Sequence, residues 1–206
     1  EACEKDVLVK VLSDFNDAAI KVCEGQQFDI DFENVANVSI DDYLMMIELK
    51  TACLLAASAK IGGVIGGANE DDAVLLYEFG KNIGIAFQLQ DDLLDLYGEQ
   101  GKFGKQVGGD ILSKKKTYLY LSFIEDADSE MAQQLKDVFF SEKIDDSTKV
   151  SEVKDLYSAL NIRLKVEDKI LFYYNAAMKN LECVNVSQER KATITQLAND
   201  LLVREL

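Results

Sequence analysis

The sequence contains no proline, no histidine and no tryptophan. Proline is the strongest helix breaker, so its absence from a chain of 206 residues favours long, uninterrupted helices. Histidine is the commonest general base and the commonest transition-metal ligand. A metal bound by this chain is therefore expected to be a hard cation held by carboxylate oxygens.

Basic residues are scarce relative to acidic ones. The chain has 22 lysines and arginines against 37 aspartates and glutamates, which gives a net charge of −15. Nucleic acids recruit basic surfaces through their phosphates, so this balance argues against a nucleic-acid partner. A polyanionic substrate would need either a local basic patch or bridging cations.

The sequence also lacks closely spaced cysteines and long apolar runs. Four cysteines lie far apart, and we expect them to be reduced, mostly buried thiols in a cytoplasmic protein: Cys3, Cys23, Cys53 and Cys183. No apolar run reaches the length of a membrane span, and no signal-peptide pattern is visible. The chain opens at Glu1 already in helical periodicity, so we expect an upstream segment to be missing.

Apolar residues recur at helical spacing along most of the chain. Gly25 is predicted to end the first helix, Ser39 and Asn69 are predicted N-caps, and the longest segment is expected to break near Asn161. The strand-like stretch FDIDF at residues 28–32 is interpreted as a loop. We therefore predict one all-α domain over residues 1–206. Its helices are expected at residues 3–24, 40–61, 70–97, 113–126, 129–142, 147–184 and 187 to the C-terminus.

Residues 87–98 read FQLQDDLLDLYG and crowd three aspartates among leucines. On a helix, Asp91 and Asp95 share a stripe about 60° wide with Gln88, and Asp92 lies at its flank. Lys81 is the only basic residue between Phe79 and Tyr97, and it lies off this stripe, so no ion pair within the helix neutralises the cluster. Two interpretations stay open: a solvated acidic face, or a site for a hard divalent cation.

Lys50 lies on an otherwise apolar helical stripe with Tyr43, Leu54, Ala57 and Ile61. A lysine in such a place either extends its apolar stem to reach water or points into a cleft that holds an anion. The stripe by itself favours the first alternative without excluding the second.

The stretch GEQGKFGKQVGGD at residues 98–110 contains five glycines together with Lys102 and Lys105, and the run 114–116 adds three more lysines. Glycines let backbone N–H groups approach phosphate, and lysines place mobile charges on it. A glycine-rich loop is usually only a flexible connection, but this one is a basic patch directly after the aspartate helix. Acidic metal ligands beside a basic loop are what a Mg²⁺–diphosphate site requires.

Several of these motifs match one family. FQLQDDLLD followed by FGKQVGGDILSKKKT resembles the second aspartate-rich region of the trans-isoprenyl diphosphate synthases, the polyprenyl synthetase family. Lys50-Thr51 is similar to the family's K-T pair, and GQQFD at residues 25–29 is similar to its G-Q-x-x-D. These elements stand in the family's order between residues 25 and 117. The chain beyond about Ile124 shows only compatible helical periodicity.

The resemblance implies a fold, a reaction and partners. The fold is a bundle of mostly antiparallel helices around a central cleft, and the protein is a cytoplasmic homodimer that uses Mg²⁺. The reaction joins an allylic diphosphate to isopentenyl diphosphate by ionisation, condensation and elimination.

The resemblance also implies roles for individual residues. Asp91 and Asp95 would hold Mg²⁺ directly, with Asp92 acting through water. The diphosphate-binding groups would be Lys50, Thr51, Gln88, Lys105 and Lys115, of which Lys50, Thr51 and Gln88 would join Asp91 in the catalytic set. The residues lining the cleft near the isoprenoid would be Gln26, Asp29 and Phe87.

The family's first aspartate-rich region, and the arginines that follow it, have no counterpart here. Three other aspartate pairs lack an aspartate three positions further on: Asp41-Asp42, Asp71-Asp72 and Asp145-Asp146. We therefore expect this chain to be the C-terminal part of an enzyme, to carry half of the active site and not to turn over by itself. The position that limits product length in the family also lies upstream.

Two rival interpretations remain. A non-catalytic subunit of a heteromeric prenyl synthase would bind and regulate a partner, but such subunits commonly lose the aspartate motif that this chain keeps. An acidic helical scaffold or cation-binding module would leave the ordered set of four motifs unexplained.

Overall fold

The structure is a computed structural model that describes residues 5–98 and 107–202. Every regular element in these ranges is a helix, which confirms the predicted all-α class. The elements are α1 (Lys5–Asn34), α2 (Ile40–Ile47), the π-helical segment η1 (Glu48–Ala52), α3 (Cys53–Ile65), α4 (Glu70–Tyr97), α5 (Gly109–Leu112), α6 (Tyr118–Asp126), α7 (Ser129–Phe139), α8 (Asp146–Ala159), α9 (Ile162–Cys183) and α10 (Gln188–Leu202).

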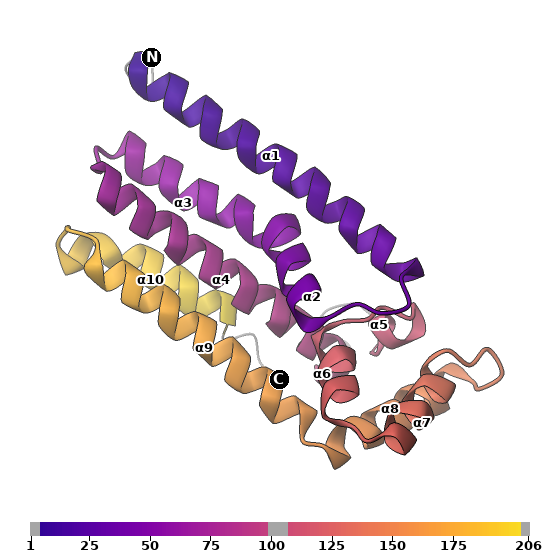
Figure 1. Ribbon diagram of the computed structural model, residues 1–206. Coiled ribbons are helices and arrows are strands. Elements are labelled where there is room, and N and C mark those ends of the chain that lie inside the picture. The colour runs from indigo at the N-terminus through magenta and orange to yellow at the C-terminus, as the bar shows by residue number, and fades with distance from the viewer. Residues whose placement is uncertain (1–4, 99–106, 203–206) are drawn as a thin grey trace.

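Helix α4 lies at the centre of the molecule (Figure 1). It packs against α3 on one side and against α9 on the other, while α1 lies beyond α3 and contacts α3 and η1. The shorter helices α6, α7 and α8 gather at one end of these long helices (Figure 1). The result is a bundle whose central helix carries the aspartates.

The core explains why α4 is central. Several of its apolar side chains are fully buried, among them Leu89 and Leu93, and these two join Phe123, Val153 and Val166 in one large cluster. Full burial of such a side chain contributes about 1.5–3 kcal/mol. The polar stripe of α4 is therefore held in place by apolar packing around most of the helix.

Side-chain caps set several of the helix starts. Ser39 and Asn69 cap α2 and α4 as predicted, each accepting a hydrogen bond from a backbone N–H of the first turn. The three aspartate pairs that do not match a metal motif lie at such starts: the first turn of α2, the first turn of α4 and the N-terminus of α8. Carboxylates at these positions stabilise helix N-termini, which accounts for them structurally.

The predicted end of the first helix at Gly25 is wrong, and so is the loop predicted for residues 28–32. Helix α1 continues through both to Asn34. Gly25 is buried against η1, where a Cβ atom would come within 2.7 Å of the Lys50 Cα atom. The glycine therefore permits a close contact between two helices and does not stop the helix.

Of two further predicted helix boundaries, one is wrong and one is confirmed. The helix predicted from Ser113 begins at Tyr118, because Lys114 has a φ of 58° that ends the short helix α5. The predicted break near Asn161 is confirmed, since the φ of 53° at this residue separates α8 from α9.

The expectation of mostly buried thiols is wrong for the described cysteines: Cys53 is buried, whereas Cys23 and Cys183 are exposed. In the two described ranges, no helix is long and apolar enough to cross a membrane.

Candidate active site

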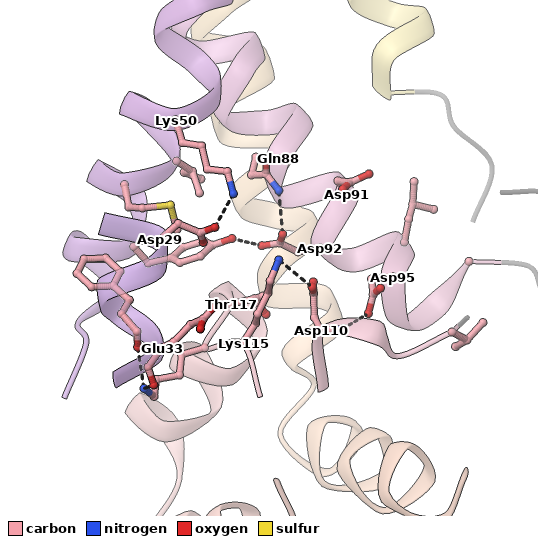
Figure 2. Close-up of a pocket in the computed structure, with 18 residues that line it drawn as sticks. Asp29, Glu33, Lys50, Gln88, Asp91, Asp92, Asp95, Asp110, Lys115 and Thr117 are labelled. Atoms are coloured by element: carbon pink, nitrogen blue, oxygen red, sulfur yellow. Dashed lines mark hydrogen bonds and ion pairs between the residues drawn. The ribbon is translucent and has the colours of Figure 1, made fainter. Parts of the chain in front are cut away.

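A cavity of about 340 Å³ opens at the end of the bundle where α1, α2, η1 and α4 meet the segment 107–117 (Figure 2). Its polar lining includes both acidic and basic side chains. The acidic groups are Asp29, Glu33, Asp91, Asp92, Asp95 and Asp110, and the amines are those of Lys50, Lys115 and Lys116. An acidic protein thus gathers three lysines around one acid-lined cavity.

Helix α4 supplies one wall through Gln88, Asp91, Asp92 and Asp95. Gln88 and Asp92 point toward the Lys50–Asp29 pair, and Asp95 points toward Asp110 (Figure 2). One turn before Gln88, Gly84 packs against Ala52, where a Cβ would come within 2.7 Å of the alanine's own Cβ. This close contact brings the aspartates of α4 next to Lys50, which lies two residues before Ala52 in η1.

Asp92 is the most buried of these carboxylates, with 5% of its surface exposed. Burial, reinforced by the nearby charge of Asp110, raises the pKa of Asp92 to about 8. Hydrogen bonds oppose that shift, because the Tyr43 hydroxyl donates to Oδ2 and the Gln88 amide donates to Oδ1 at 3.2 Å. Burial also raises the pKa of Tyr43 well above its usual range.

Lys50 extends from η1 into the cavity, and its Nζ lies 2.5 Å from Asp29 Oδ2. Asp29 reaches this point because it lies one turn beyond Gly25 in α1, and the contact of Gly25 with η1 fixes the distance between the two elements. The lysine therefore faces the cavity, which is the second of the two orientations considered from the sequence.

The segment 107–117 closes the cavity from the other side. The backbone N–H of Asp110 donates to Asp95 Oδ2 at 3.0 Å, and the Lys115 amine lies 3.7 Å from Asp110 Oδ1. Lys116 donates to the carbonyls of Phe32 at 2.8 Å and Val35 at 2.7 Å, at the C-terminal end of α1. Burial lowers the pKa of Lys116. These contacts tie the lysine-rich segment to both α4 and α1.

Apolar side chains complete the lining: Phe32, Met46, Ile47, Leu94 and Val107. They place a hydrocarbon surface beside the charged groups. The cavity is therefore suited to a ligand with one polyanionic end and one apolar end.

The structure brings together seven of the residues singled out from the sequence: Asp29, Lys50, Gln88, Asp91, Asp92, Asp95 and Lys115. Thr51 does not line the cavity, but its hydroxyl donates to Gln88 Oε1 at 2.9 Å. Gln26 is exposed and Phe87 is half-buried, and neither lines the cavity. Lys105 lies outside the described residues.

Four further residues line the cavity but were not singled out individually from the sequence: Tyr43, Asp110, Lys116 and Thr117. Tyr43 precedes Lys50 by seven residues on the same helical stripe, which was a usable signal. Asp110 ends the basic loop that follows the aspartate helix, and this position in the sequence could have indicated that it lies near the aspartates. No pattern in the sequence indicated that Lys116 donates hydrogen bonds to backbone carbonyls at the end of α1.

The carboxylates fit a hard divalent cation that completes its shell with other ligands. Within residues 5–98 and 107–202, no three acidic or cysteine side chains converge tightly enough to hold an ion alone. Mg²⁺ is commonly bound by one or two carboxylates together with waters and substrate phosphates, so it does not need such a cage. The exposed share of Asp91 and Asp95 leaves them accessible from the cavity.

An all-α bundle with aspartates and lysines lining one partly apolar cavity defines a protein suited to a ligand with a polyanionic end and an apolar tail. The family model for polyprenyl synthetase matches residues 2–160. The chain belongs to the polyprenyl synthetase family.

Individual relatives agree with this assignment. The short chain isoprenyl diphosphate synthase of Methanocaldococcus jannaschii is 38% identical over 151 residues, which cover 73% of this chain and 45% of that protein. A crystal structure of a geranylgeranyl pyrophosphate synthase superposes with a TM-score of 0.91 at 38% identity, covering 99% of this chain and 63% of the other.

A second solved structure is the geranylgeranyl pyrophosphate synthase of Corynebacterium glutamicum complexed with isoprenyl diphosphate and magnesium. It superposes with a TM-score of 0.86 at 26% identity and covers 98% of this chain and 57% of the other. The chain thus spans about half of the length of the relatives it matches.

Proposed function

We propose that the complete protein is a Mg²⁺-dependent prenyl transferase that condenses an allylic diphosphate with isopentenyl diphosphate to make a longer polyprenyl diphosphate. The observation that carries this proposal is the opposition of the α4 aspartates to Lys50 and Lys115 across one cavity. The names of the relatives support the same reaction class.

The aspartates are the proposed holders of the metal. Asp91 and Asp95 would bind Mg²⁺ directly, and Asp92, whose two oxygens already accept protein donors, would act through water. The bound ion would supply charge stabilisation for the departing diphosphate. A relative solved with isoprenyl diphosphate and magnesium supports the choice of ion.

Lys50 and Lys115 are the proposed partners of the allylic diphosphate. Each is paired with an aspartate in the structure, Asp29 and Asp110 respectively, and would turn its amine to the incoming phosphate oxygens. Charge-assisted hydrogen bonds of this type strengthen as negative charge develops on the leaving group. Thr51 orients Gln88 beside them, and Lys105 of the glycine-rich loop would join this set.

The apolar lining has a separate role. Loss of diphosphate leaves an allylic cation that water would quench, and Phe32, Met46 and Ile47 place apolar surface beside the charged groups of the cavity. Gln26 and Asp29 are proposed to border the reacting carbons and the water around the metal, and Phe87 is proposed to pack near the isopentenyl unit. Of these three residues, Asp29 lines the cavity, whereas Gln26 and Phe87 would act from outside that lining. No histidine is needed, because the released diphosphate can accept the final proton.

We further propose that the complete protein acts as a cytoplasmic homodimer, as the family resemblance implies. The exposed apolar side chains of α1, such as Leu12 and Phe15, support an additional packing partner for that helix.

The test is turnover by the complete protein with an allylic diphosphate, isopentenyl diphosphate and Mg²⁺, with product chain length read by mass spectrometry. We expect release of diphosphate together with a longer prenyl product, and loss of both when EDTA is added. Well-folded protein that forms no product from allylic substrates of several lengths would refute the proposed activity and point to a non-catalytic subunit.

A further inference from the structure

Tyr43 and Asp92 form a buried pair between α2 and α4. Tyr43 is 4% exposed and Asp92 is 5% exposed, and the tyrosine hydroxyl donates a hydrogen bond to Asp92 Oδ2. A buried carboxylate is costly unless donors satisfy it, so this hydroxyl stabilises Asp92 in its observed orientation.

The second oxygen of Asp92 is also occupied. Gln88 Nε2 donates to Oδ1 at 3.2 Å, and Gln88 Oε1 in turn accepts from the Thr51 hydroxyl at 2.9 Å. Because Thr51 occupies its oxygen, the Gln88 amide can present only its nitrogen to Asp92. A chain of hydrogen bonds therefore runs from η1 through α4 to α2.

This chain connects the two elements that carry the opposed charges. Thr51 is the neighbour of Lys50 in η1, and Asp92 follows Asp91 directly on α4. Tyr43 closes the chain from α2, whose start is fixed by the Ser39 cap. The distance between Lys50 and the aspartates of α4 thus depends on Tyr43 as well as on the groups assigned to the diphosphate.

We propose that Tyr43 is a positioning residue for the prenyl transfer described above. It acts through Asp92 to keep the α4 aspartates and Lys50 at their observed separation across the cavity. The proposal rests on the proposed function. Loss of a partner that orients a metal-binding carboxylate commonly lowers metal affinity or activity by roughly 10- to 100-fold.

The test uses Tyr43→Phe in the complete protein, because phenylalanine keeps the ring in the core and removes only the hydroxyl. We expect kcat to fall by roughly 10- to 100-fold, and the Mg²⁺ concentration for half-maximal rate to rise, with little change in the KM for the allylic substrate. The matched control is Tyr120→Phe, since Tyr120 is 5% exposed in the same core cluster and does not line the cavity. Its kcat and Mg²⁺ dependence should stay at wild-type values.

A double variant tests whether Tyr43 acts through Asp92. If it does, Tyr43→Phe added to Asp92→Asn should lower kcat by less than threefold beyond Asp92→Asn alone, because the acceptor that it orients is already altered. Full additivity, or a Tyr43→Phe variant with wild-type kcat and Mg²⁺ dependence, would overturn the positioning role while leaving the proposed activity in place. An inactive wild-type protein would overturn the activity and the role together.

Discussion

At the scale of single residues, two ion pairs between α1 and the neighbouring helical run are nearly matched. Lys50 pairs with Asp29 at 2.5 Å and Lys60 pairs with Asp14 at 2.7 Å, with lysine side chains 30% and 24% exposed. Only the Lys50 pair lines the cavity with the aspartates of α4. The comparison separates a role in anion binding from a role in holding α1 in place.

We predict that Lys50→Ala weakens binding of the allylic diphosphate by roughly 10- to 100-fold, because a hydrogen bond to a charged group contributes about 1.5–3 kcal/mol. Lys60→Ala should destabilise the fold by a similar amount as Lys50→Ala without changing that affinity. Calorimetric titration and thermal unfolding of both variants measure the two quantities. Equal affinities in the two variants would mean that Lys50 serves only the fold.

The residue-scale predictions from sequence succeeded where spacing alone defines a face. Asp91, Asp95 and Gln88 were placed on one stripe by helical periodicity, and all three line the cavity. Lys116 could not be found in this way, because its partners are backbone carbonyls of Phe32 and Val35, more than eighty residues earlier. Contacts between distant segments leave no periodic trace in the sequence.

At the scale of elements, the position of α1 depends on Gly25. A Cβ at this position would come within 2.7 Å of both the Leu49 carbonyl carbon and the Lys50 Cα atom. These are backbone atoms of the segment that carries Lys50, so they cannot move aside without moving the lysine.

We predict that Gly25→Ala destabilises the protein by about 1–3 kcal/mol, the range for overpacking a tight interface. Gly62→Ala in α3 is the matched control, since no atom lies within 4 Å of its Cβ position. That change should instead stabilise the protein by roughly 0.5–1 kcal/mol through helix propensity. Denaturant unfolding of both variants checks the opposite signs; a neutral or stabilising Gly25→Ala would contradict the close contact.

The same glycine shows why part of the fold could not be predicted. In an amphipathic sequence pattern, a glycine that ends a helix cannot be distinguished from one that permits a close contact between helices. Gly25 was predicted to end the helix, but it permits a close contact. Caps such as Ser39 and Asn69 were predicted, because their hydrogen bonds are made within one turn.

The π-helical segment η1 was also invisible to periodicity, because it inserts extra chain into a helix without a sequence signal. Leu54 and Ala57 were predicted to lie on one helical face with Lys50. Beyond η1 they differ in burial, because Leu54 is 46% exposed and Ala57 is 3% exposed. Such segments often occur at functional sites, and here the segment carries Lys50 and Thr51.

At the scale of the whole molecule, the charge balance opposes the proposed ligand. A chain with a net charge of −15 repels a diphosphate at long range, so binding depends on the local lysines and on a cation that screens the α4 aspartates. The central claim is therefore that the cavity binds diphosphate only together with Mg²⁺, and that Asp91 is among the groups responsible.

The most direct measurement is calorimetric titration of the complete protein with inorganic diphosphate, with and without Mg²⁺. We expect binding that requires Mg²⁺ and that Asp91→Ala weakens at least tenfold. Asp71→Ala, an exposed aspartate in the first turn of the same helix, should bind like the wild-type protein. Diphosphate binding that is equally tight without Mg²⁺, or unchanged in Asp91→Ala, would contradict the assignment of this cavity.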